Sequence, residues 1–161
     1  MAKKIYLDDK PDPVFYTLLG ISCHLKDYRL SFLLNQHLGF AFAKMDDLRV
    51  NSPVHKSEAD FSFYNSFNEE KLFSYYLIAN RSQDFILVPE MKQIDFILFV
   101  EGKCNKQGRG SLIKKIRMVP GILTAIEIDF AAIKNIENLL TDIEMHVMNI
   151  RKIPKIRYQP R

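Results

Sequence analysis

The stretch Ile94-Asp95-Phe96-Ile97-Leu98-Phe99-Val100 decides the fold, because its apolar run does not alternate with polar residues. Such a run is typical of a strand inside a sheet with both faces covered. Pro89 lies just before it and lacks the amide hydrogen that a strand ladder needs, so we expect Pro89 to divide two strands or to lie at a sheet edge. The sequence therefore predicts a central strand here.

This strand opens a predicted strand-helix-strand unit over residues 94–130. A glycine-containing basic loop follows it, and we expect Ser111 to cap a short helix. Residues 122–130 then predict a half-buried strand, because one set of side chains alternates with another. The first set is Ile122, Thr124, Ile126, Ile128 and Phe130, and the second is Leu123, Ala125, Glu127 and Asp129.

A similar unit is predicted around residues 15–47. Residues 15–25 alternate as in a strand, and leucines recur at helical spacing over residues 30–38. Asp27 is the expected N-cap of that helix, and Gly39 is its expected left-handed end.

Between and after these units, the sequence predicts a hairpin and a long helix. Aromatic residues alternate on both sides of the polar turn at residues 68–71, and we expect them in the core or in an oligomer contact. Apolar residues at helical spacing over 133–147 predict the long C-terminal helix. Together the elements predict an α+β fold: a largely antiparallel sheet with helices packed on it, built around two strand-helix-strand units as in ferredoxin-like proteins.

Length and composition favour one globular domain over residues 1–150, followed by a basic tail over 151–161 that Pro154 and Pro160 make extended or loose. The 161 residues are 47% hydrophobic, which excludes a wholly disordered chain. Two cysteines cannot form a disulfide framework, and no apolar stretch approaches the ~20 residues that cross a bilayer. The N-terminus turns acidic where a signal peptide needs apolar residues. We expect a cytoplasmic protein without membrane association.

Positive charge is concentrated in two places, although the formal net charge is only +4. One is the tail, and the other is the segment over residues 102–118, which contains no acid. Its six bases form a possible anion or nucleic-acid contact, but a solvated loop and outer helix face is the interpretation that we favour. These bases are Lys103, Lys106, Arg109, Lys114, Lys115 and Arg117.

The segment Val88-Pro89-Glu90, three residues, then Ile94-Asp95-Phe96 resembles the signature of a family of uncharacterised bacterial proteins named for the motif IPExxxVDY. Pro89, Glu90 and Asp95 match the motif outright, and Phe96 replaces a tyrosine without its hydroxyl. The resemblance implies membership of a group and no established activity. More distantly, the second unit and its Val119-Pro120-Gly121-Ile122 turn look like the first half of a small regulatory ligand-binding module of the ACT type.

Few residues of the sequence indicate catalysis or metal binding. Glu90 and Asp95 could work as an acid–base pair, but we favour structural roles: Glu90 bonding backbone amides at the break, and Asp95 pairing with a base or capping a turn. The histidines and cysteines show no ligand spacing, so we expect no metal and no cofactor. Cys104, next to Lys103, could have a lowered thiol pKa, although an ordinary loop cysteine is the interpretation that we favour.

The sequence therefore favours a non-enzymatic binding or regulatory module. It would act through an exposed sheet face or hairpin, by contact with another protein or by self-association. The alternative is a protein that binds RNA or a phosphate ligand through residues 102–118 and the basic tail. An enzyme that uses Glu90 and Asp95 is the third and least favoured hypothesis.

Overall fold

The computed structural model describes residues 16–52, 57–83 and 85–157. Predictions for residue 15 and for Pro160 lie outside these ranges. The elements, in chain order, are β1 (Tyr16–Cys23), α1 (Asp27–Leu38), β2 (Ala43–Ser52), β3 (Ser57–Asn68), β4 (Phe73–Ala79), β5 (Arg81–Ser82), β6 (Phe85–Ile86), the 3₁₀ helix η3 (Pro89–Met91), β7 (Phe96–Glu101), α2 (Lys106–Arg117), β8 (Ile122–Ile128), the 3₁₀ helix η4 (Phe130–Ala132) and α3 (Ile136–Arg157).

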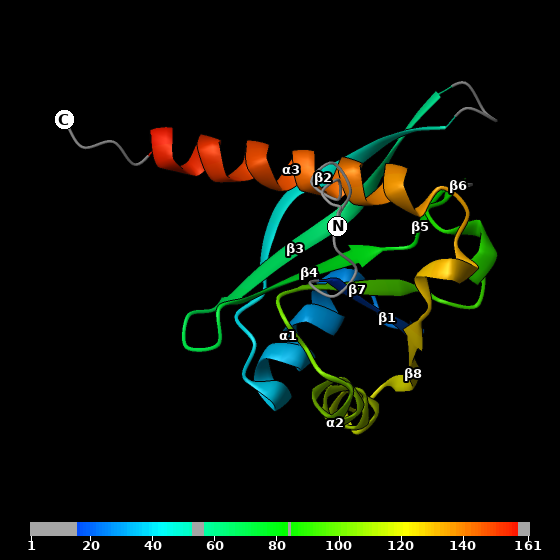
Figure 1. Cartoon of the computed structure of the whole chain (residues 1–161), viewed down its shortest axis with the longest axis vertical. Helices are drawn as coiled ribbons and strands as arrows, with labels where there is room; N and C mark the ends of the chain where they lie inside the picture. The colour runs from blue at the N-terminus through cyan, green and yellow to red at the C-terminus, as the bar shows by residue number, and fades with distance from the viewer. Residues whose placement is uncertain (1–15, 53–56, 84, 158–161) are drawn as a thin grey trace, which may run out of the picture.

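Six strands form one sheet in the order β2-β3-β4-β7-β1-β8, and every neighbouring pair is antiparallel (Figure 1). β7 lies inside the sheet between β4 and β1, which confirms the predicted central strand. The predicted hairpin is β3–β4. The short strands β5 and β6 pair only with each other. β2 and β8 are the edges of the sheet.

Both predicted strand-helix-strand units are present in an α+β fold. α2 connects β7 to β8, and β1 lies between these two strands, as in a split βαβ unit. α1 leads from β1 to β2, which lies at the far edge beyond β7, β4 and β3. The β2–β3 hairpin therefore extends the sheet away from its ferredoxin-like part.

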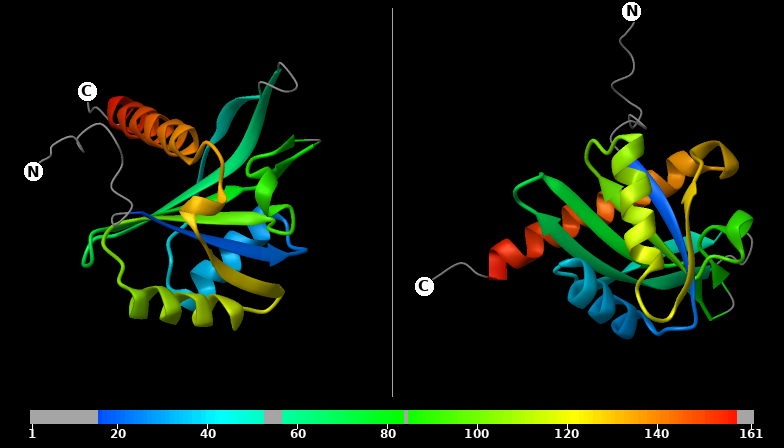
Figure 2. Two further views of the ribbon diagram at one scale, coloured as in Figure 1. Left: turned by 45° about the vertical axis from the view of Figure 1, so that its right-hand side comes forward. Right: turned by 90° about the horizontal axis from the view of Figure 1, so that it is seen from below.

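Helices cover both faces of the sheet, so the core has two layers. α1 and α2 lie on one face and α3 on the other (Figure 2). The α3 layer includes Phe61, Phe63, Ile97, Phe99, Leu140 and Ile143. The α1 and α2 layer includes Leu19, Leu30, Tyr64, Tyr75, Leu98 and Ile116. Most hairpin aromatics are thus in the core, which is one of the two places that we expected for them.

The helix starts differ from two predictions. Lys26, not Asp27, occupies the N-cap position of α1, while Gly39 ends the helix at φ 77° as predicted. α2 begins at Lys106, because the Asn105 side chain accepts a hydrogen bond from the Gly108 amide and caps the first turn. Ser111 is therefore an interior helix residue. The low helix propensity of two glycines made this first turn look like a loop.

Two further predictions are corrected at the C-terminal elements. Ile122 packs in the α1 and α2 layer, whereas Ile126 and Ile128 pack in the α3 layer, because the pairing of β8 with β1 shifts between Ser22 and Cys23. The backbone of α3 stays helical through Pro154 to Arg157, where we predicted an extended tail. Once α3 is packed on the sheet, each added turn extends an existing helix, which favours continuation past Pro154 against the cost of a lost hydrogen bond and a ring clash.

Candidate functional site

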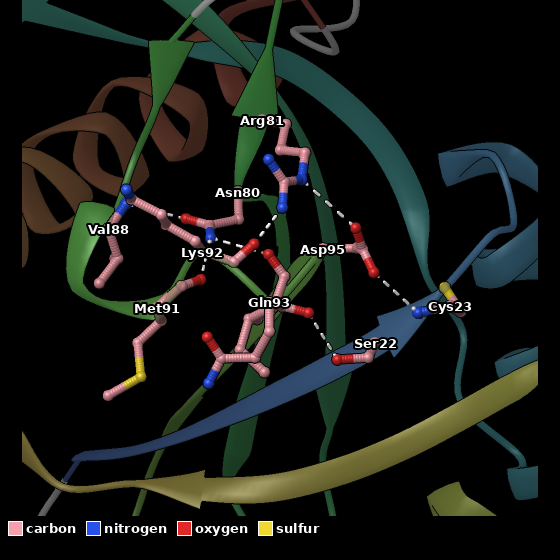
Figure 3. A network of polar contacts seen from close by, with 10 residues as sticks. Ser22, Cys23, Asn80, Arg81, Val88, Met91, Lys92, Gln93 and Asp95 are labelled. Carbon is pink, nitrogen blue, oxygen red and sulfur yellow. Dashed lines mark hydrogen bonds and ion pairs between the residues drawn. The ribbon is translucent and has the colours of Figure 1, made fainter.

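The segment that carries the signature-like motif is held by a network of hydrogen bonds around Asn80 (Figure 3). Asn80 has no exposed surface. Its amide group donates to the carbonyls of Met91 (3.1 Å) and Ile94 (2.8 Å), and its side-chain oxygen accepts from the Val88 amide (2.8 Å). One side chain therefore closes the loop between β4 and β7. The sequence offered no signal for this role beyond a polar residue after a strand.

Asp95 joins the same loop to β1. Its carboxylate accepts from the Cys23 amide (2.9 Å) and lies 3.4 Å from Arg81 Nε, so the expected pairing with a base is present. Arg81 also donates to the Lys92 carbonyl, and Ser22 donates to the Gln93 carbonyl (2.7 Å). Figure 3 shows these contacts side by side. Asp95 thus has the structural role that we favoured.

Pro89 and Glu90 complete the segment. Pro89 occupies the first turn of η3, between β6 and β7, and so divides two strands as predicted. The Glu90 carboxylate accepts from the Lys134 amide (3.2 Å), which joins η3 to the segment before α3. Glu90 and Asp95 therefore bind different elements and share none of these partners.

The six bases of residues 102–118 differ in the contacts that they make. Arg109 faces Glu127 across 3.0 Å and donates to the Cys104 carbonyl (2.7 Å). Arg117 donates to the Ala125 carbonyl (2.9 Å). Four lysines are exposed: Lys103, Lys106, Lys114 and Lys115. The two arginines therefore hold the fold together, and only lysines are left as possible anion contacts.

The two sheet edges differ in how they are protected. In β2 the pairing with β3 shifts between Met45 and Leu48, and a ring nitrogen of His146 on α3 lies 2.8 Å from the Asp46 carbonyl. An irregular strand covered by a helix is a poor template for pairing with another strand. β2 is therefore interrupted as an edge around Asp46.

β8 presents backbone groups outward. The Ile21 carbonyl accepts from the Asp95 amide, so the backbone of Ile21 turns toward β7. Ala125 lies opposite Ile21 in the register, and its own backbone groups therefore turn away from β1. Glu127 lies two residues further along β8, so its backbone groups also turn away from β1. Arg117 binds the outward carbonyl of Ala125, and no other partner of these outward groups is described.

Exposed apolar side chains flank this edge. Leu123 on β8 is 64% exposed, and Met118 at the end of α2 is 83% exposed. The turn between them is fixed because Gly121 has φ 91° and packs against Leu25, leaving no room for a side chain. We define the β8 edge as Met118, Leu123, Ala125 and Glu127 with Arg117 beside them.

The remaining candidate features are a reactive cysteine, a metal site and a membrane-spanning helix. Burial raises the pKa of the Cys104 thiol, so the lowered pKa that neighbouring lysines suggested is wrong. Among residues 16–52, 57–83 and 85–157, no three His, Cys, Asp or Glu side chains form a group that could hold a metal ion. No described helix is long and apolar enough to cross a membrane.

No family model, curated protein or solved structure matches the chain. The resemblances to the IPExxxVDY signature and to an ACT-type module therefore stay predictions.

Proposed function

We propose that this protein is a non-enzymatic binding module that acts by contact with another protein, and that the partner is a second copy of the same chain. The observation that carries the proposal is the contrast between the sheet edges. β2 shifts register in its middle and contacts α3 at Asp46, whereas β8 shifts only at its start and pairs regularly with β1 over residues 124–128. The outward backbone groups of this regular stretch lie beside the exposed Leu123.

Pairing of two β8 strands suits this geometry. An antiparallel pair is self-complementary, because a two-fold axis between the strands brings the same groups of each copy together. The outward groups of Ala125 and Glu127 would gain partners, and Leu123 would lose contact with water. Arg117 opposes the pairing, because it binds the outward carbonyl of Ala125 and must turn away.

Light scattering across a concentration series tests the proposal. Wild-type protein is expected to reach twice the mass of one chain. Leu123→Lys should shift the equilibrium toward monomer, and Arg117→Ala should shift it toward dimer. Met148→Lys is the control, because Met148 is similarly exposed and belongs to α3, which covers the opposite face of the sheet from α1 and α2. A wild-type monomer at all concentrations contradicts the proposal.

Binding of RNA or a phosphate ligand is the second candidate. It is supported by Lys106, Lys114 and Lys115, which are exposed and have no ion pair within the described part of the chain. At about 100° per residue these three lysines spread over half the circumference of α2, so they do not form one compact site. Affinity that falls steeply with salt and weakens in Lys114→Ala/Lys115→Ala would support this candidate, and salt-independent binding would contradict it.

A further inference from the structure

A cavity of about 650 Å³ lies where β1 starts and β8 ends, beside the first turns of α2. Its volume is in the range of small-molecule sites. Charged and aromatic side chains from several elements line it, including Tyr16, Arg109, Glu127, Asp129 and Phe130. The protein-contact proposal uses none of Tyr16, Arg109, Asp129 or Phe130.

The positive charge in this cavity is already neutralised. Arg109 Nε lies 3.0 Å from the Glu127 carboxylate, and another guanidinium nitrogen donates to the Cys104 carbonyl. Cys104 adds no negative charge at neutral pH, since burial raises its thiol pKa. The ion pair therefore leaves no net positive charge in the cavity to attract an anionic ligand.

Asp129 leaves an excess of negative charge. One of its oxygens accepts from the Ala131 amide (3.0 Å) and caps η4. Among the described residues no cation pairs with Asp129, so its charge and the exposed side of Glu127 are open to a ligand. Phe130, which also lines the cavity, supplies aromatic surface for an apolar body.

We propose that this cavity binds a small organic cation, an amine on a short apolar body, with the ammonium group held by Asp129 and Glu127 and the body against Phe130. Glu127 belongs to both proposals, but this site uses its carboxylate and the proposed self-association uses its backbone groups. Arg109, one of the six bases named as possible anion contacts, acts here as the partner that orients Glu127.

Titration with two probes of equal chain length, 1,4-diaminobutane and butanedioate, tests the site by amide NMR shifts. The diamine should shift the signals of Glu127, Asp129 and Phe130 with saturation, and butanedioate should not. Asp129→Asn keeps the oxygen that caps η4 and removes the charge, so diamine affinity should fall about fivefold or more. Glu58→Gln makes the same change in net charge outside the cavity lining and should leave the affinity unchanged.

A charge reversal provides the second arm. In Glu127→Gln/Asp129→Asn, Arg109 is the remaining charge among the named lining residues, and the cavity should then prefer butanedioate. Repeating the diamine titration on Leu123→Lys separates this site from the proposed contact, because binding should persist in the monomer. The proposal is overturned if the wild-type protein prefers butanedioate, if neither probe shifts these signals, or if Asp129→Asn behaves like Glu58→Gln.

Discussion

Replacing Asn80 with alanine tests whether one buried amide holds the loop between β4 and β7. Asn80→Ala leaves the Val88 amide and the Ile94 carbonyl without partners, and both residues have no exposed surface. Each buried group left unpaired costs about 1–3 kcal/mol, so together we expect a loss of about 4 kcal/mol. The Met91 carbonyl adds little, because it also accepts a hydrogen bond from the Ile94 amide (3.1 Å) and keeps that partner. Such a loss is a large part of the ~5–15 kcal/mol that stabilises a typical domain.

Urea unfolding followed by circular dichroism measures this loss as a lower transition midpoint at unchanged slope. Asn149→Ala is the matched control, because Asn149 is exposed on α3 and the change should stay within about 0.5 kcal/mol. A loss below about 1 kcal/mol in Asn80→Ala would refute the role given to this side chain.

Two further predictions concern a glycine and a tyrosine. Gly102→Ala should destabilise the protein strongly, because φ is 141° and a β-carbon would lie 2.0 Å from a Phe73 ring carbon; an unchanged melting temperature would contradict this. Burial and the nearby Asp27 carboxylate raise the pKa of Tyr64 from 10.0 to about 12. The folded state therefore binds more protons than the unfolded state between these values, and stability should fall as pH rises through that window. Tyr64→Phe should show a smaller fall, and urea unfolding at about pH 9 and pH 11 measures the difference.

The sheet was the most predictable part of the structure. The unalternating run at residues 96–100 identified β7 as an interior strand, since only a strand covered on both faces needs apolar residues on both. The aromatic alternation at residues 61–79 identified the β3–β4 hairpin. A regular pattern over several residues is a reliable signal of a strand, because a strand needs apolar side chains on each face that it buries.

One local helix cap and several long-range contacts were not predictable. The start of α2 depends on the Asn105 cap, and nothing local distinguishes that cap from a turn when glycines follow. The approach of Arg109 to Glu127 depends on how α2 packs against β8, and the role of Asn80 depends on the path of the loop to β7. A one-residue shift such as that between Ser22 and Cys23 changes which face a side chain occupies, and alternation alone does not reveal it.

Hydrogen exchange at the β8 edge tests self-association most directly. The amides of Ala125 and Glu127 face away from β1 and have no described partner, so they should exchange quickly in dilute protein. If two copies pair through β8, these amides should become protected as protein concentration rises, while amides along β2 stay unchanged. Fast exchange of Ala125 and Glu127 at every concentration, with the molecule nonetheless dimeric, would place the contact elsewhere and contradict the proposed edge.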